Sequence, residues 1–260
     1  MALHTRITCA IASPLPEKLV AQIPSVFTKQ GKILYNQRNQ IRVFNINGEE
    51  INVKKYCIPS IFNRLIYSAG IRMPKAQRAF ENMEKLLKIG ISTPNPYAYI
   101  IEKENGILGF SYLISRQIDG KTIGYDSHSK ALISQLAHFT ADMHQKGALH
   151  RDYTPNNILL SEKEGHYAFS LVDTNQCVFS EKPIPVWRAL PYLIQLFLKN
   201  KEFSYFVAEY ARFRGADPQR CCRTAKRLRH IRTCYSKLKK WLKKIPGSRL
   251  ITAKRLDKTS

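Results

Sequence analysis

The sequence predicts an α+β protein of two lobes, a strand-rich first lobe followed by a helix-rich second lobe. Three observations support this. The 260 residues are 44% hydrophobic and 23% charged, which is an ordinary globular composition. Strand-like runs separated by turn residues fill the chain up to about residue 115, and helical spacing of apolar residues dominates after Gly120. We therefore expect domains at 1–115 and 116–260, joined near residues 115–119.

Three β-strands are expected near the start of the first lobe. Residues 32–35, 40–46 and 50–56 are rich in Ile, Val, Phe and Tyr. They are separated by residues 36–39 and by Asn47-Gly48, and Asn-Gly is a strong hairpin signal. The pattern predicts a small antiparallel sheet.

A helix and two more strands complete the expected first lobe. Residues 75–89 carry apolar side chains at helical spacing, and Gly90 stands where a C-terminal cap belongs. The prolines of residues 93–96 end this helix, and residues 97–101 and 108–115 have strand character. In the second lobe, residues 130–146 and most of the chain after Pro185 are predicted to be helical.

The chain is strongly basic. It holds 42 Lys and Arg against 19 Asp and Glu, a formal net charge of +23. Such a charge informs about partners rather than fold, and nucleic acid, an anionic membrane and a phosphorylated substrate would each supply the opposite charge. The composition alone does not choose among them.

About a third of the cations lie near the C-terminus, where residues 220–258 hold 15 Lys or Arg and one acid, Asp257. Within this segment an apolar stripe at helical spacing predicts an amphipathic helix with a cationic back. Two interpretations stay open: a helix docked on the body with a solvated charged face, or a surface that also meets anionic lipid or nucleic acid. The stripe consists of Ala225, Leu228, Ile231, Tyr235, Leu238, Leu242 and Ile245.

Cysteine usage and hydropathy suggest a cytosolic protein. The six cysteines form no CxxC pair, which favours reduced thiols over disulfides or a zinc site. The apolar patch at residues 9–12 is short for a signal peptide, and no stretch has the length and hydropathy of a membrane-spanning helix. We expect a protein that is cytoplasmic, or at most peripheral on a membrane.

Chemistry-bearing residues concentrate at the start of the second lobe. His150-Arg151-Asp152 is followed by Asn157, and an apolar strand then ends on Asp173. Two carboxylates and an amide brought together there would supply the hard oxygen ligands that Mg²⁺ prefers. Phosphoryl transfer needs that metal and a carboxylate beside the attacking hydroxyl. The alternative is a Pro-Asn turn between a helix and a strand without catalysis.

This pattern resembles the catalytic loop and metal-binding Asp of the protein-kinase-like fold. The resemblance implies that Asp152 is the catalytic base or orients the acceptor hydroxyl, and that Asn157 and Asp173 are magnesium ligands. Residues 51–56 look like the strand that supplies the phosphate-binding Lys. Lys54 is the better candidate there, although Lys55 or an ordinary surface lysine are alternatives.

In such kinases that Lys pairs with a Glu on the following helix. Here Glu81 is the first choice and Glu84 the second.

Departures from the protein-kinase pattern restrict the class of acceptor that we expect. The first hairpin turn, residues 36–39, carries no GxGxxG, Thr154 stands where Ser/Thr protein kinases have Lys, and Thr174-Asn175 follows Asp173. About a dozen residues separate Asp173 from the helical region after Pro185, too few for a peptide-binding activation segment. A small or carbohydrate hydroxyl is therefore the expected acceptor.

Several stretches together resemble the bacterial lipopolysaccharide kinase family of Kdo and heptose kinases. The similarity extends over residues 31–179 and is strongest over residues 147–175, and it includes Lys54-Lys55-Tyr56 and residues 90–96. It implies an ATP- and magnesium-dependent sugar kinase that acts on a lipopolysaccharide-core glycolipid at the cytoplasmic face of the inner membrane. The basic C-terminal helix would meet the anionic membrane, and no specific nucleic acid is expected.

Two alternatives stay open. One is a kinase of the same fold acting on another small molecule or a protein. The other is a catalytically inactive, anionic-membrane-binding protein, which the missing Gly-rich loop would suit.

Overall fold

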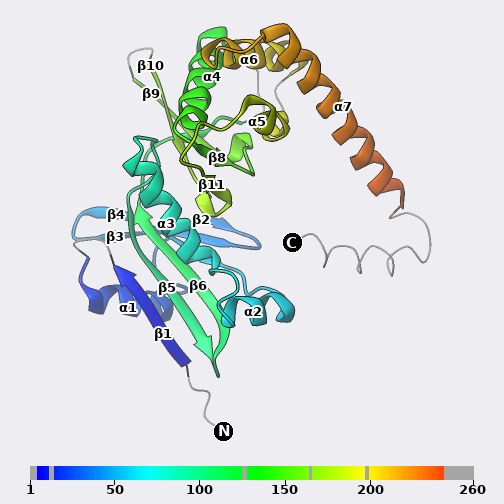
Figure 1. The fold of residues 1–260 in the computed structure, drawn as a ribbon. Helices are drawn as coiled ribbons and strands as arrows, with labels where there is room; N and C mark the ends of the chain where they lie inside the picture. The colour runs from blue at the N-terminus through cyan, green and yellow to red at the C-terminus, as the bar shows by residue number, and fades with distance from the viewer. Residues whose placement is uncertain (1–4, 12–14, 125–127, 164–165, 197–198, 243–260) are drawn as a thin grey trace. The chain divides into compact units, whose positions relative to one another are not determined.

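A computed structural model of the chain describes residues 5–11, 15–124, 128–163, 166–196 and 199–242 (Figure 1). The described residues form two compact units, each made of two separate chain segments. Unit 1 combines Met1–Asp126 with Asp142–Ile184, and unit 2 combines Ser127–Ala141 with Pro185–Ser260. The division into lobes at 1–115 and 116–260, expected from the sequence, stays a prediction.

Unit 1 is built on a six-stranded antiparallel sheet with the strand order β1-β5-β6-β4-β3-β2. Asn47 and Gly48 both have positive φ in the turn between β3 and β4, which confirms the hairpin expected from this dipeptide. The strands are β1 (Thr5–Ile11), β2 (Lys32–Asn36), β3 (Gln40–Ile46), β4 (Glu49–Tyr56), β5 (Pro96–Glu104) and β6 (Ile107–Arg116).

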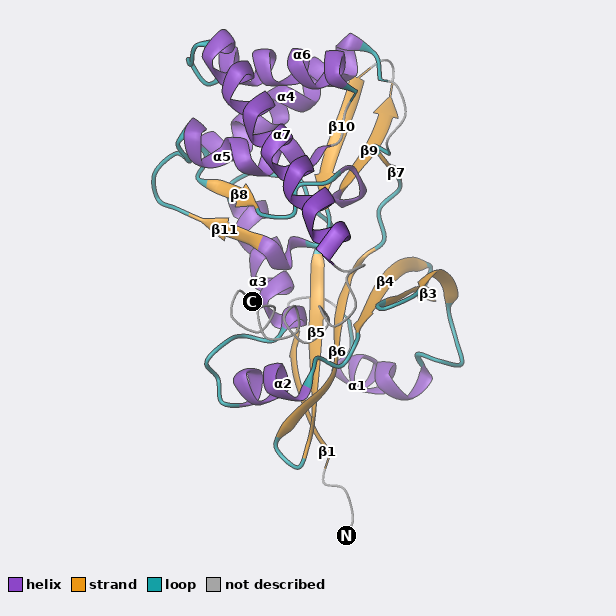
Figure 2. Ribbon diagram, turned by 90° about the vertical axis from the view of Figure 1, so that its right-hand side faces the viewer, coloured by secondary structure: helices purple, strands orange, loops and turns teal. Residues whose placement is uncertain are grey.

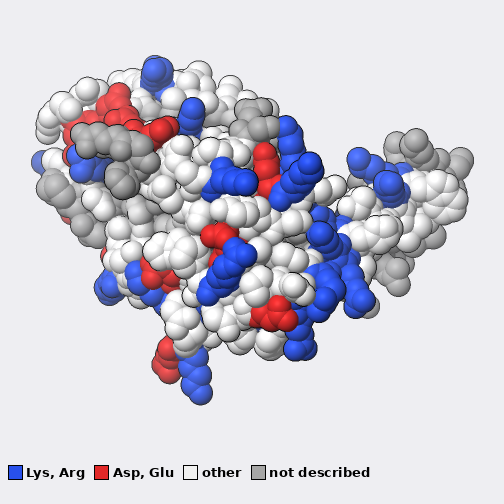
Figure 3. All heavy atoms as spheres, turned by 90° about the horizontal axis from the view of Figure 1, so that it is seen from above, with Lys and Arg blue, Asp and Glu red and all other residues white. Residues whose placement is uncertain are grey.

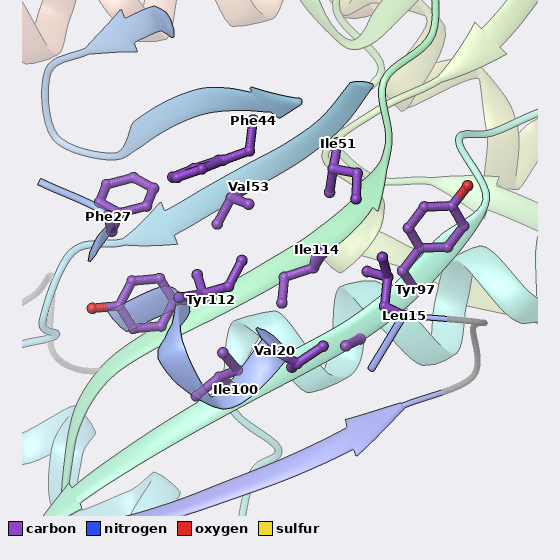
Figure 4. Packing of buried hydrophobic residues seen from close by; sticks show 12 residues of the cluster. Leu15, Val20, Phe27, Phe44, Ile51, Val53, Tyr97, Ile100, Tyr112 and Ile114 are labelled. Atoms are coloured by element: carbon purple, nitrogen blue, oxygen red, sulfur yellow. The ribbon is translucent and has the colours of Figure 1, made fainter. Parts of the chain in front are cut away.

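Helices α1 (Glu17–Val26) and α3 (Lys75–Lys88) cover opposite faces of this sheet (Figure 2). Figure 4 shows the core on the α1 face, where Val20 and Phe27 pack among Val53, Tyr112 and their neighbours. On the other face, Ala76, Ala79, Phe80 and Met83 of α3 pack against Tyr56 and Leu113. Side chains of a strand alternate between the two faces of a sheet. In β4, Ile51 and Val53 therefore face α1, whereas Tyr56 faces α3.

Three elements at the six-stranded sheet were not expected from the sequence. Strand β1 pairs with β5, and helices α1 and α2 (Ile61–Ser68) join the single helix that was expected there. Pro24 inside α1 obscures its helical pattern, although Val20 and Ile23 are buried at a spacing of three. Helix α2 buries only Tyr67, so it lacks a strong inward stripe.

The remainder of unit 1 is a set of short strands that carries the catalytic-loop motif. β9 pairs with both β10 and β7, and β8 pairs with β11. These elements are β7 (Lys121–Thr122), β8 (Ala148–His150), η1 (Pro155–Asn157), β9 (Ile158–Lys163), β10 (His166–Leu171), η2 (Thr174–Gln176) and β11 (Cys177–Phe179).

Unit 2 is helical. It comprises most of α4 (Lys130–Gln145), then α5 (Val186–Leu193), η3 (Ile194–Leu196), α6 (Asn200–Phe213) and α7 (Pro218–Leu242). Its described core includes Phe203, Phe206 and Tyr210 of α6. Ser134 of α4 donates a hydrogen bond of 3.0 Å to Glu209 of α6, so the two chain segments of this unit are joined by side chains as well as by packing.

Helix α7 packs only over its first half. Cys221 and Ala225 are buried, and Arg229 lies over the Phe203 ring, 4.6 Å from its centroid. Beyond them, Ile231 and Tyr235 are exposed, as are Leu238, Trp241 and Leu242. The apolar stripe expected from the sequence is therefore buried only near the start of this helix and exposed in its second half, and Ile245 lies outside the described residues. None of the helices in the described ranges is long and apolar enough to cross a bilayer.

Candidate active site

The two lysines of β4 point to opposite faces of the sheet. The Lys55 ammonium lies over the Phe110 ring, 3.7 Å from its centroid, on the face that α1 covers. Lys54, one residue earlier, lies on the α3 face beside the Tyr56 ring. The strand alternation therefore directs Lys54, and not Lys55, toward the residues of the catalytic-loop region.

Lys54 forms an ion pair with Asp173. Its Nζ lies 2.8 Å from Oδ1 of Asp173, and the two side chains are 13% and 30% exposed. Burial alone would raise the pKa of Asp173, but the charge and hydrogen bond of Lys54 outweigh burial, and the pKa falls below its ordinary value. The carboxylate is thus ionised at neutral pH and remains partly exposed.

His150 fixes the catalytic loop to the end of the Asp173 strand. Its Nδ1 accepts the backbone N–H of Asp152 at 3.2 Å, so the proton resides on Nε2, which donates to the carbonyl of Val172 at 3.3 Å. Burial lowers the pKa of His150, in keeping with a neutral ring. This ring therefore sets the spacing between the Asp152 backbone and the residue that precedes Asp173.

Asn157 is held beside the Asp152 carboxylate and is bonded to the residue that precedes Asp173. Its Nδ2 donates to the backbone carbonyl of Asp152 at 2.8 Å and to the Asp152 carboxylate at 3.2 Å. The backbone carbonyl of Asn157 accepts the N–H of Val172 at 3.0 Å, and this bond extends the β9–β10 ladder to the residue before Asp173. Asp152, Asn157 and Asp173 are thereby brought to one end of this ladder.

The donor set fits a divalent cation of the magnesium type. Both amide hydrogen bonds of Asn157 use its nitrogen, and no hydrogen bond in the described ranges uses its side-chain oxygen. An amide oxygen and an ionised carboxylate are hard ligands, and magnesium takes few protein ligands because it keeps water and phosphate oxygens. Asn157 and Asp173 would hold the ion.

The backbone turns sharply at Asp173, and helix α3 secures the turn. Asp173 has a φ of 54°, and the Asn175 side chain donates to its carboxylate. Thr174 donates to the carbonyl of Ala79 at 3.0 Å, and Asn82 donates to the carbonyl of Thr174 at 2.8 Å. Asn82 was not singled out from the sequence; it is buried at 6% exposure, and its position on the inward face of the α3 pattern was the available signal.

The expected ion pair between Lys54 and the α3 glutamates is not formed. Within the described part of the chain, no ion pair joins Lys54 to Glu81 or Glu84. Glu81 instead accepts a hydrogen bond of 3.0 Å from Gln77, one helical turn earlier. Burial raises the pKa of Tyr99 in β5, and the negative charge of Glu81 raises it further. Asp173 occupies the position at Lys54 that a glutamate was expected to take.

A second lysine, Lys75, feels the charge of Asp173, and Arg38 acts on that lysine; neither residue was assigned to the site from the sequence. Burial lowers the pKa of Lys75, the nearby Arg38 lowers it further, and Asp173 acts in the opposite direction. Lys75 begins α3, and Arg38 lies in the turn between β2 and β3. Lys54 and Lys75 therefore both interact with the charge of Asp173, and Arg38 adds positive charge beside Lys75, an excess that is suited to phosphate.

A pocket of about 320 Å³ lies where the sequence placed the junction of its two lobes. It is lined by Thr93, Asn95, Arg116, Gln117, Ile118 and Asp119. The N–H groups of Arg116 and Gln117 donate to the carbonyls of Asn95 and Glu50, so the chain here is fixed by its own backbone bonds. The expected junction between the two lobes therefore lines a concave surface.

Comparison with known proteins identifies the family. The profile of the "Lipopolysaccharide kinase (Kdo/WaaP) family" matches residues 25–188, more than half of the chain. The chain belongs to this family. The matched range contains every candidate site residue from Lys54 to Asp173. A comparison with curated proteins finds no match.

Solved structures show that the lipopolysaccharide kinase chain has a protein-kinase-like fold. The structure "WaaP in complex with acyl carrier protein" is similar with a TM-score of 0.55 and 15% identity, over 85% of this chain and 99% of that one. An aminoglycoside-3'-phosphotransferase of type VIII gives a TM-score of 0.50 and 11% identity, over 82% and 100%. At these identities the likeness establishes the fold, which the sequence had predicted.

Proposed function

We propose that this kinase transfers the γ-phosphate of ATP, with magnesium, to a sugar hydroxyl of the lipopolysaccharide inner core, on Kdo or heptose. The observation that carries the proposal is the Lys54–Asp173 ion pair of 2.8 Å beside the Asp152–Asn157 hydrogen bonds. Membership of the lipopolysaccharide kinase family supports the acceptor class.

Asp152 is the residue that receives the acceptor proton. Its carboxylate is exposed, and its backbone is fixed by His150 and Asn157, so it can meet a hydroxyl without rearranging the loop. The hydroxyl oxygen forms a bond to the γ-phosphorus, the bond from that phosphorus to the ADP oxygen breaks, and the proton passes to Asp152.

Lys54 and the other cations near Asp173 neutralise phosphate charge during transfer. The Lys54 ammonium is held by Asp173 and packed on Tyr56, so its position is set before nucleotide binds. A magnesium ion bound by Asn157 and Asp173 would supply charge neutralisation at the phosphate oxygens. The pocket at residues 116–119 would receive the nucleoside.

The short chain between Asp173 and α5 supports a sugar acceptor over a peptide. Only η2, β11 and a few connecting residues precede Val186, where α5 begins. Asn82 and Thr174 tie the start of this segment to α3. No long segment stands here to present a protein chain to Asp152, whereas a sugar hydroxyl needs no such platform.

For an acceptor of this class we expect the enzyme to act at the cytoplasmic face of the inner membrane, and α7 is suited to bind that surface. Figure 3 shows Lys and Arg side chains gathered along this helix. The helix has no acidic residue, and its exposed stripe includes Tyr235, Leu238 and Trp241. Basic amphipathic helices bind anionic lipid surfaces by charge and by shallow insertion of the apolar face.

One transfer assay tests the phosphotransfer proposal. The protein is incubated with labelled ATP and magnesium, together with lipopolysaccharide core, an aminoglycoside, casein or no acceptor. We expect label in the core fraction only, and loss of transfer when the metal is chelated. Transfer to casein or to the aminoglycoside alone would refute the core acceptor, and no transfer to any acceptor would favour the inactive membrane-binding alternative.

A second assay tests the membrane role of α7. Trp241 is 60% exposed on the apolar stripe, whereas the other tryptophan, Trp187, lies on α5. Vesicles of anionic brominated lipid should quench the emission of Trp241, and Trp241→Phe should remove most of the quenching. Quenching that persists unchanged in Trp241→Phe would contradict insertion of α7.

A further inference from the structure

Helix α2 and its flanks present an unusual exposed apolar surface. Large apolar side chains gather within 16 residues of chain, and Ile61 and Ile71 are 61% and 78% exposed. Isolated apolar residues on a surface are ordinary, but several large ones exposed on one short helix and its flanks indicate an interaction site. We call this surface the α2 patch; it consists of Ile58, Ile61, Phe62, Leu65, Ile71 and Met73.

The α2 patch is not a loosely packed core face, because the inner side of α2 is already bound to the sheet. Tyr67 is buried with Ile101 and Leu108. Arg64 donates through Nε to the carbonyl of Leu108 at 2.6 Å, and the N–H of Leu108 donates to Ser68 at 2.8 Å. These bonds fix the helix with its apolar outer face directed away from the protein core.

The charge around the α2 patch selects its partner. Over the patch itself, from residue 58 to residue 73, the chain has no Asp or Glu, and its two cations are Arg64 and Arg72. Arg72, between Ile71 and Met73, lies 5.9 Å from the centroid of the buried Tyr67 ring and is partly exposed. An apolar surface with cations and no acids matches an anionic lipid bilayer, where headgroups meet the cations and acyl chains meet the apolar side chains. A second copy of this cationic patch would instead bring like charges together.

We propose that the α2 patch rests on an anionic lipid bilayer, with Phe62 and its apolar neighbours among the outer acyl chains and Arg72 at the headgroup level. This is a lipid contact of the sheet unit, separate from α7 and from the phosphotransfer residues. It can therefore fail while the proposed reaction and the α7 contact both stand.

The test uses the full chain and vesicles of phosphatidylcholine with phosphatidylglycerol, separated by flotation. The variant carries Ile61→Gln, Phe62→Gln and Leu65→Gln, and the control is Trp187→Gln, which replaces an apolar side chain that is 75% exposed on α5. We expect the triple variant to bind about tenfold more weakly at both low and high salt, because the lost contact is apolar. The control should bind like the wild type.

Two results would overturn the proposal. One is equal vesicle binding by the triple variant and the control. The other is a wild-type dimer that the triple variant converts to a monomer at unchanged vesicle affinity, which would assign the patch to a second copy of the chain. Circular dichroism checks folding; if the triple variant does not fold, Phe62→Trp decides instead, since brominated lipid must quench the added emission if the patch inserts and must leave it unchanged if it does not.

Discussion

Replacing Lys54 by Met should abolish most phosphotransfer, whereas Lys55→Met should leave it nearly intact. The two lysines are adjacent and chemically identical, and only the alternation of β4 separates them. Lys54 meets Asp173 on one face, and Lys55 lies over Phe110 on the other. The two variants together therefore test whether the phosphate-binding lysine lies on the face of β4 that carries Lys54.

The expected magnitude follows from the ion pair. At 2.8 Å and an effective dielectric of about 20, the attraction between the charges is about 6 kcal/mol, most of which desolvation offsets. Because Asp173 is partly exposed, we expect Lys54→Met to reduce the free energy of unfolding by about 2–3 kcal/mol. The loss of one preorganised cation at the phosphates should lower kcat by about 10²–10³.

Steady-state transfer to lipopolysaccharide core and urea denaturation measure the two effects separately. Lys55→Met should lose about 1 kcal/mol of stability, because its ammonium is removed from an aromatic face, while kcat changes less than about threefold. Equal loss of kcat in both variants, or loss in Lys55→Met alone, would refute the assignment of Lys54 to the phosphate site.

Three further predictions concern other residues of the site. Asp173→Asn should abolish transfer and leave ATP hydrolysis undetectable, since a carboxylate ligand is lost; a rate near the wild type would show that the metal binds elsewhere. Lys75→Ala should lower kcat/KM for ATP about tenfold with little change for the acceptor, measured by varying each substrate in turn. The lowered pKa of His150 means that the unfolded chain takes up its proton first, so stability should fall below about pH 6.5 by up to about 1.4 kcal/mol per pH unit; His150→Gln should flatten this slope in pH-dependent denaturation curves.

Much of the fold was predictable because its signals are local. Asn47-Gly48 fixes a hairpin by backbone preference alone, and the apolar spacing of α3 fixes its buried face. The catalytic-loop motif was readable for the same reason, as Asp152 and Asn157 lie five residues apart on one loop. Helix α1 was not predicted, because a proline usually ends a helix and Pro24 lies inside this one.

The assembly of the site could not be derived in the same way. Which acidic residue meets Lys54 depends on how α3 lies on the sheet; the sequence led to Glu81 as the first choice and Glu84 as the second, and Asp173 was not considered as a partner of Lys54. The anchoring of α3 by Asn82 joins residues 92 and 95 positions apart in the chain, and no local pattern encodes such pairings. The choice between Lys54 and Lys55, in contrast, was implicit in the alternation of Ile51 and Val53.

The discontinuous make-up of the two units bears on how the enzyme can be divided. The family match ends at residue 188, which suggests a minimal kinase fragment cut nearby. Such a fragment would keep residues 128–141 but lose α6, and with it the Glu209 that accepts a hydrogen bond from Ser134 and the Phe213 ring that lies 4.6 Å from His138. The side of α4 that contacts α6 would then face water. The end of the family match at residue 188 therefore does not coincide with the end of a folding unit. We expect a chain truncated there to aggregate, even though every candidate catalytic residue is present.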